Sequence, residues 1–107
     1  MPRKDWGKTW FAVTLQRVGF RETRKVMEFA VAWSIVTRDL GRPPKNIEEY
    51  SGWWGQSAAS GYREQTAWRA AWPEYPTPSA WFEAVGVDPA EAPEGGVEAL
   101  FLSGQVA

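Results

Sequence analysis

The segment 21–41, RETRKVMEFAVAWSIVTRDLG, constrains the fold of this chain more than any other. Its apolar residues recur at steps of three and four and therefore share one face of an α-helix; they are Val26, Phe29, Ala30, Trp33, Val36 and Leu40. The apolar surface is widened by Met27, Val31 and Ile35, so we expect the helix to be covered on more than one side. Thr23 is the predicted N-cap, and Gly41 followed by Pro43 and Pro44 ends the helix. This segment is the predicted central helix of the core.

The size and composition of the chain narrow the class of protein. A chain of 107 residues makes one small domain, and its 44% hydrophobic residues with eight Trp can form a core unaided. Cysteine and histidine are both absent, which excludes disulfides, thiolate or conventional zinc sites, and serine or cysteine triads. No carboxylate pair or Gly-rich phosphate motif indicates catalysis, so we expect neither an enzyme nor a cofactor nor a bound metal. No apolar run approaches the roughly 18 residues that span a bilayer. We therefore expect a soluble, cytoplasmic protein without a membrane partner.

Two shorter helices are predicted downstream, with a tight turn between them. Asn46 is the predicted N-cap of NIEEYSGWWG, with Glu49 three residues later as in a capping box, and Gly55 ends this helix. Ser57 can cap the following AASGYREQTAWRAAW, which Pro73 terminates. This arrangement predicts a helix-turn-helix at about residues 46–72. No hairpin signal follows it, so we expect no conventional wing.

The two ends of the chain complete an all-α small helical bundle. Residues 8–19, KTWFAVTLQRVG, fit a helix, although their β-branched and aromatic content also suits a strand. Ser79 is the predicted cap of a short helix, AWFEAVG. We therefore assign residues 1–85 to one helical domain, and residues 86–107 to an acidic linker followed by a short C-terminal apolar helix.

Residues 29–78 resemble the small helix-turn-helix proteins common in phages and actinobacteria. The resemblance rests on AWSIVTRDLGRPP and IEEYSGWWGQSAASGYREQTAWRAAWPEYPTP, including the Gly55 turn and the YREQ segment. Three residues depart from the family pattern: Gln56 follows the turn glycine, Gly61 replaces a core residue, and Glu64 stands where an apolar residue often packs inward. The resemblance implies DNA binding and transcriptional control, with the second helix in the major groove.

The resemblance also implies which residues face DNA. Those expected near the bases are Ser57, Ala58, Ala59, Ser60 and Arg63, with Arg69 nearer the phosphate backbone. Only Arg63 clearly carries a group that reads base edges, because the alanines offer apolar contact alone. A second basic cluster contains Arg24 and Lys25, together with Arg17 and Arg21, and forms either a phosphate-binding edge or an ordinary solvated helix start.

The tryptophans admit both a core and a binding interpretation. Trp33, Trp68 and Trp72 fall on predicted apolar faces and are assigned to the core. Trp53 and Trp54 are adjacent, so we expect one of them to be exposed as a partner-binding residue. Leu100 and Phe101, with Leu102, are too apolar for a free tail. We expect this C-terminal segment to dock near Trp53, Trp54 and Trp81, or to complete a dimer.

Charge is distributed unevenly along the chain. Residues 1–72 contain all 12 Lys and Arg against seven acids, whereas residues 73–107 contain six acids and no base. A body of net charge +5 suits a polyanion. The leading hypothesis is a small, non-enzymatic regulator that binds double-stranded DNA as a homodimer. The alternative is a protein-binding module, such as a phage-type inhibitor of a host protein, because base-reading groups are few and tryptophans are many.

Overall fold

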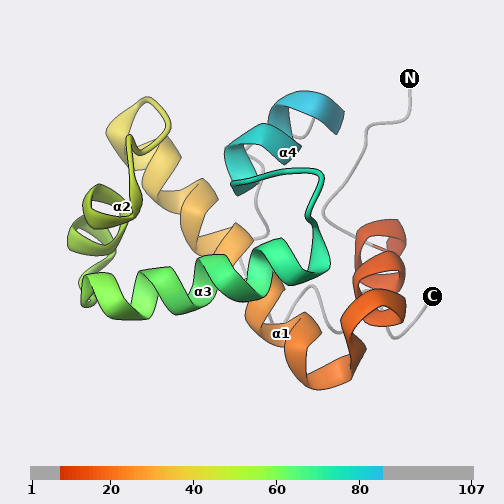
Figure 1. Ribbon diagram of the computed structural model, residues 1–107. Helices are drawn as coiled ribbons and strands as arrows, with labels where there is room; N and C mark the ends of the chain where they lie inside the picture. Colours follow the sequence, from red (N-terminus) through yellow and green to blue (C-terminus); the bar gives the residue numbers. More distant parts are fainter. Residues whose placement is uncertain (1–7, 86–107) are drawn as a thin grey trace.

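The computed structural model describes residues 8–85, and within this range the regular elements are all helices. α1 spans Lys8–Leu40, α2 Ile47–Trp54, α3 Ala58–Ala71 and α4 Pro78–Val85. Figure 1 shows α3 crossing α1, with α2 beside the start of α3 and α4 above the other half of α3. The predicted all-α bundle is confirmed, and residues 8–19 are helical. Residues 86–107, including Leu100, Phe101 and Leu102, lie outside the described residues.

A sharp bend at Gly19 divides α1 into two parts, which point in different directions in Figure 1. Gly19 has φ 82° and ψ 171°, a conformation that is strained for residues with a Cβ atom. The prediction that Thr23 caps the start of the central helix is wrong. Its hydroxyl donates to the Gly19 carbonyl oxygen at 2.7 Å, one turn earlier, so Thr23 lies inside the helix.

The second part of α1 is the centre of the core. Five of its predicted core residues are buried, and Leu40 is partly buried; the five are Val26, Phe29, Ala30, Trp33 and Val36. Met27 and Val31 are buried as well, which confirms that the helix is covered on more than one side. The centroid of the Phe29 ring lies 5.3 Å from that of Tyr50 in α2 and 6.3 Å from that of Trp68 in α3. This one side chain therefore joins three helices.

The first part of α1 is fastened to the end of α3. Arg17 donates to both carboxylate oxygens of Glu74 at 2.9 and 2.8 Å and to the Ala71 carbonyl oxygen at 2.9 Å. Its guanidinium also lies 4.4 Å from the Trp72 ring centroid, a cation–π distance. These hydrogen bonds lower the pKa of the Glu74 carboxyl. Arg17, which the sequence placed in a basic cluster, therefore has a structural role.

The predicted caps of α2 and α3 are confirmed. The Asn46 side chain accepts from the Glu49 N–H at 2.8 Å, and the Ser57 hydroxyl accepts from the Ser60 N–H at 3.2 Å. Gly55 ends α2 in the left-handed region, with φ 89°. The Glu49 carboxylate is held by the Arg42 guanidinium and the Lys45 N–H, which lower its pKa to about 2.

The cap of α4 differs from the prediction. This helix begins at Pro78, and Thr77 Oγ1 accepts from the Ala80 N–H at 3.4 Å, so Thr77 is the cap. Ser79, the predicted cap, instead accepts a hydrogen bond of 2.6 Å from the Trp33 indole. The Ser79 hydroxyl is therefore engaged by α1, a partner that is distant in the sequence.

α2 and α3 approach each other closely at Gly61. A Cβ atom at this position would overlap the Ser51 hydroxyl and lie 2.8 Å from Ile47 Cγ2. This contact explains the glycine at position 61, because only glycine leaves room for α2. The three-residue turn and the close contact together fix the angle between the two helices.

Gln56 and Glu64, on either side of the start of α3, bind each other through their side chains. The Gln56 amide donates to Glu64 Oε1 at 2.6 Å, and the Tyr50 hydroxyl donates to the same oxygen at 3.2 Å. Burial of the phenol, reinforced by the nearby carboxylate, raises the pKa of Tyr50 far above its ordinary value. Glu64 therefore points toward α2, as an apolar residue would, but it is satisfied by hydrogen bonds.

Substitution of Gly61 by Ala should destabilise the protein, although alanine has the higher helix propensity by about 1 kcal/mol. The new methyl group must displace Ser51 or Ile47, and overpacking of this kind costs about 1–3 kcal/mol. Gly52 in α2 is the matched control, because nothing lies within 4 Å of the position where its Cβ atom would stand. We expect Gly52→Ala to raise the urea midpoint and Gly61→Ala to lower it; equal gains would contradict the close contact.

Substitution of Glu64 by Ala should remove the acceptor shared by Tyr50 and Gln56, at a cost of about 1–3 kcal/mol in the free energy of unfolding. Glu64→Gln keeps an acceptor oxygen at the same place and should cost clearly less. Both variants are to be compared by urea unfolding at neutral pH. An alanine variant as stable as the parent would show that these hydrogen bonds do not hold α3 against α2.

Candidate nucleic-acid interface

The exposed face of α3 is the surface on which most of the predicted DNA-facing residues converge. At 3.6 residues per turn, one side of this helix is turned away from the core; its exposed residues are Ala59, Tyr62, Arg63, Thr66, Arg69 and Ala70. Of the predicted residues, Ala59, Arg63 and Arg69 lie on this face, and Ala58 and Ser60 are half-buried at its edge. Ser57 is exposed, but its hydroxyl is engaged in capping the helix.

Three residues of this face were missed by the sequence reasoning. Tyr62, Thr66 and Ala70 follow Ala59 at steps of three and four residues, so helical spacing alone contains the signal that finds them. The Tyr62 hydroxyl donates to Glu48 of α2 at 2.6 Å, which lowers the pKa of the Glu48 carboxyl. Ala59, Thr66 and Ala70 form a strip of small side chains along the middle of the face.

Arg63 and Arg69 lie on the two edges of this face. Six residues of helix separate their directions by about 120° around the axis. Arg63 borders the groove between α3 and α1, where its Nη2 donates to Ser60 Oγ at 3.1 Å. Arg69 borders the opposite groove, and its Nε donates to the Pro76 carbonyl oxygen at 3.1 Å. Neither arginine forms an ion pair with another residue of the range 8–85.

No carboxylate projects from the exposed face of α3. The only acid of this helix is Glu64, which is turned toward α2 and bound by Tyr50 and Gln56. The face therefore combines two cations with small and uncharged side chains. Carboxylates lie at its borders: Glu48 accepts from the Tyr62 hydroxyl, and Glu22 and Glu28, paired with Lys25 and Arg24, line the groove beside Arg63. The middle of the face therefore suits a polyanion better than its borders do.

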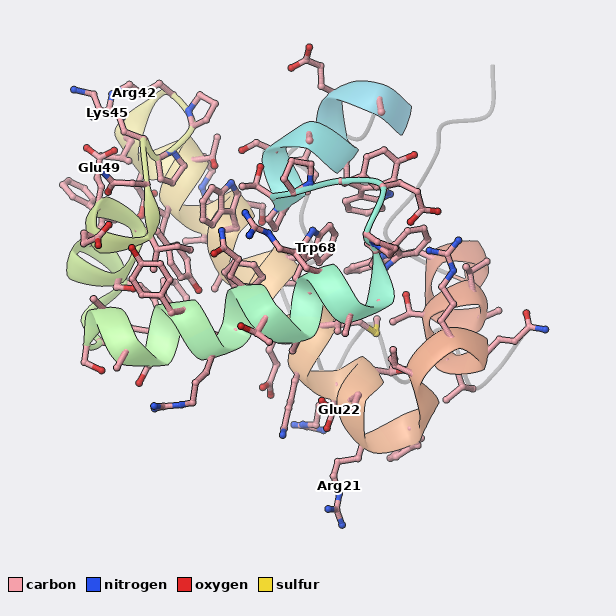
Figure 2. All side chains as sticks on the ribbon, viewed as in Figure 1. Arg21, Glu22, Arg42, Lys45, Glu49 and Trp68 are labelled. Carbon is pink, nitrogen blue, oxygen red and sulfur yellow. The ribbon has the colours of Figure 1, made fainter. Side chains whose placement is uncertain are left out.

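The second predicted DNA contact, at Arg24 and Lys25, is largely neutralised. Arg24 Nε lies 3.2 Å from a Glu28 carboxylate oxygen, and Lys25 Nζ lies 3.4 Å from one of Glu22. The spacing of three or four residues on a helix is the sequence signal for such pairs. Arg21, from the same predicted cluster, extends from the bend of α1 away from the body in Figure 2. Of this cluster, Lys25 lines the groove that Arg63, Thr66 and Ala70 of α3 also line, together with Glu22 and Glu28.

Both of the adjacent tryptophans of α2 are exposed, whereas the sequence predicted only one. Trp53 is 56% exposed and Trp54 42% exposed. α2 ends at this point, so the core does not extend far enough to cover either ring. The prediction that Trp81 shares their surface is wrong: it is buried and stacks on Trp10 with ring centroids 4.7 Å apart. The predicted core positions of Trp33, Trp68 and Trp72 are confirmed, and Figure 2 shows Trp68 inside the bundle.

Two further features, a metal-binding cluster and a membrane-spanning helix, are absent from the residues that the structure describes. Within residues 8–85, no three acidic side chains are placed to hold a metal ion. Within the same range, no helix combines the length and the apolar character that crossing a bilayer requires.

Comparison with known proteins adds no family assignment. The chain matches no protein-family model, no curated protein and no solved structure.

Proposed function

We propose that this chain is a non-enzymatic regulator that binds double-stranded DNA, with α3 as the helix that enters the major groove. The observation that carries the proposal is the exposed face of α3, where Arg63 and Arg69 flank a strip of small side chains and no carboxylate projects. The resemblance to small helix-turn-helix proteins extends the proposal to transcriptional control in a phage or a bacterium.

The shape of this face suits a groove. The major groove is about 12 Å wide and admits one α-helix. Small side chains at Ala59, Thr66 and Ala70 let the helix backbone approach the floor. Arg63 is then close enough to contact a base edge or a phosphate, and Arg69, whose Nε is bound to Pro76, faces the phosphate backbone on the other side. Ion-paired side chains would first have to leave their carboxylates, so Arg63 and Arg69 are better placed for this role than Arg24 and Lys25.

The proposed binding depends more on phosphate than on base edges. On this face only Arg63, near the start of α3, carries a long hydrogen-bond donor that can read a guanine edge. A single module with so few base contacts has limited affinity, and the proposal therefore includes a homodimer that binds two half-sites. Binding of this kind is sensitive to salt and only moderately selective for sequence.

We predict that the protein binds duplex DNA at low salt and that its affinity falls linearly with the logarithm of salt concentration. Arg63→Ala should weaken binding about five- to hundredfold and reduce the salt slope by about one, because one phosphate or base contact is lost. Lys25→Ala is the matched control: Lys25 lines the same groove but is paired with Glu22, so its loss should change affinity less than about twofold. Fluorescence anisotropy with a labelled duplex measures both effects.

Three results would contradict the proposal. The first is an absence of duplex binding at low salt, and the second is an affinity that does not change with salt. The third is equal weakening by Arg63→Ala and Lys25→Ala, which would place the DNA on the α1 side of the groove and not on α3. Circular dichroism of each variant shows whether the helical fold is retained.

The exposed pair Trp53 and Trp54 favours a second candidate function, the binding of a host protein. Two neighbouring tryptophans at 56% and 42% exposure are unusual on a small domain, and tryptophan is enriched where protein interfaces gain most of their affinity. The pair lies at the end of α2, before the turn, and so is separate from the middle of α3. A protein partner could therefore engage this end of α2 through contacts other than those proposed for DNA.

For this second candidate, we predict that the tagged full chain retains a stoichiometric protein from a nuclease-treated host lysate. The double variant Trp53→Ala/Trp54→Ala should lose this protein, because it removes the apolar contact area. Tyr62→Ala removes an exposed aromatic side chain from α3 and should leave the interaction intact. Capture that is unchanged by the double variant, or no stoichiometric protein at all, counts against this function.

A further inference from the structure

A second groove lies on the side of α3 that faces Arg69. It is formed where the α1–α2 connection, the start of α2, the middle of α3 and the start of α4 meet, and it encloses about 410 Å³. This volume falls within the range of about 300–1,000 Å³ that is typical of small-ligand sites. Its walls include the apolar or aromatic side chains Trp33, Ile47 and Tyr62.

Arg69 is the charged residue that α3 contributes to this groove. Its Nε donates to the Pro76 carbonyl oxygen at 3.1 Å, which holds the guanidinium against the segment that precedes α4. The two terminal nitrogens make no hydrogen bond or ion pair with other residues of the described range. They form a planar pair of donors, the arrangement that binds carboxylate and phosphate oxygens in a bidentate manner.

Two uncharged donors line the same groove. Gln65, one turn before Arg69, makes no side-chain hydrogen bond within the described residues. The Ser79 hydroxyl oxygen accepts the Trp33 indole proton at 2.6 Å, so its own proton is directed elsewhere, and no residue of the range 8–85 accepts it. Among the described residues that line the groove there is no carboxylate, while Lys45 adds a second positive charge at its edge.

We infer that this groove is a binding site for a small oxyanion, a carboxylate or a phosphate monoester, which carries a short apolar body. Its oxygens accept hydrogen bonds from the Arg69 guanidinium, the Gln65 amide and the Ser79 hydroxyl. The apolar body lies against the exposed Tyr62 ring, beside the largely buried Ile47 and Trp33, which also line the groove. The inference rests on the groove and its donors. Because Arg69 also belongs to the proposed DNA surface, we expect a bound anion and a DNA phosphate to compete for its guanidinium.

The test is a two-dimensional NMR titration of the full ¹⁵N-labelled chain. Benzoate and phenyl phosphate are the probes, with sodium chloride at matched ionic strength and pH as the reference. The Trp33 indole N–H, the Gln65 side-chain amide and the Arg69 Nε–H report on the groove from three sides. We expect their signals to shift saturably with one or both probes and only slightly with chloride. Saturation by benzoate alone identifies a carboxylate site, and saturation by phenyl phosphate alone a phosphate site.

Variants decide whether the shifts arise in this groove. Arg69→Ala should weaken binding at least about tenfold, because a charge-assisted pair of hydrogen bonds is lost. Gln65→Leu, which keeps the size and helix propensity of the residue, should weaken it by a smaller factor. Arg63→Ala removes a cation from the other edge of α3 and should have no effect. The inference is overturned if neither probe gives a saturable shift, or if Arg69→Ala and Arg63→Ala behave alike.

Discussion

The contact of Phe29 with Tyr50 and Trp68 is the interaction on which the rest of the structure depends. Each ring comes from a different helix, and each is excluded from solvent. Aromatic rings of this size bury large apolar areas, so the cluster supplies much of the driving force in a chain with no disulfide and no metal cluster within its described part. Because α2 and α3 are both anchored to α1 in this way, the three-residue turn between them is held at a fixed angle, and α3 presents one defined face.

The local sequence was enough to predict the helices. It was not enough to predict contacts between residues that are distant in the chain. Asn46, Gly55 and Ser57 make their capping and turn hydrogen bonds with residues at most four positions away, so the local sequence predicted these roles. Ser79 has the local character of a cap, yet its hydroxyl is bound to Trp33, 46 residues away. Thr23 failed as a cap for a different reason: the helix already begins before it, and an internal threonine bonds back to the preceding turn.

The candidate site was predicted in part for similar reasons. The position of Arg63 follows from the helix-turn-helix spacing, whereas the inward turn of Glu64 depends on Gln56 and Tyr50 meeting it across the turn. Gln56, Gly61 and Glu64 are thus compatible with the geometry of the two helices. They leave a face that has charge for a polyanion but few groups that distinguish one base pair from another.

The bend at Gly19 has a consequence for the order in which the molecule assembles. The first part of α1 depends on Ala71, Trp72 and Glu74, which lie 54 to 58 residues later in the chain. During synthesis this segment therefore emerges well before the residues that hold it, and contacts of such long sequence separation form more slowly than local ones. The bend at Gly19 turns the first part of α1 toward the end of α3, so that Arg17 reaches Ala71 and Glu74 although the central part of α1 runs in another direction.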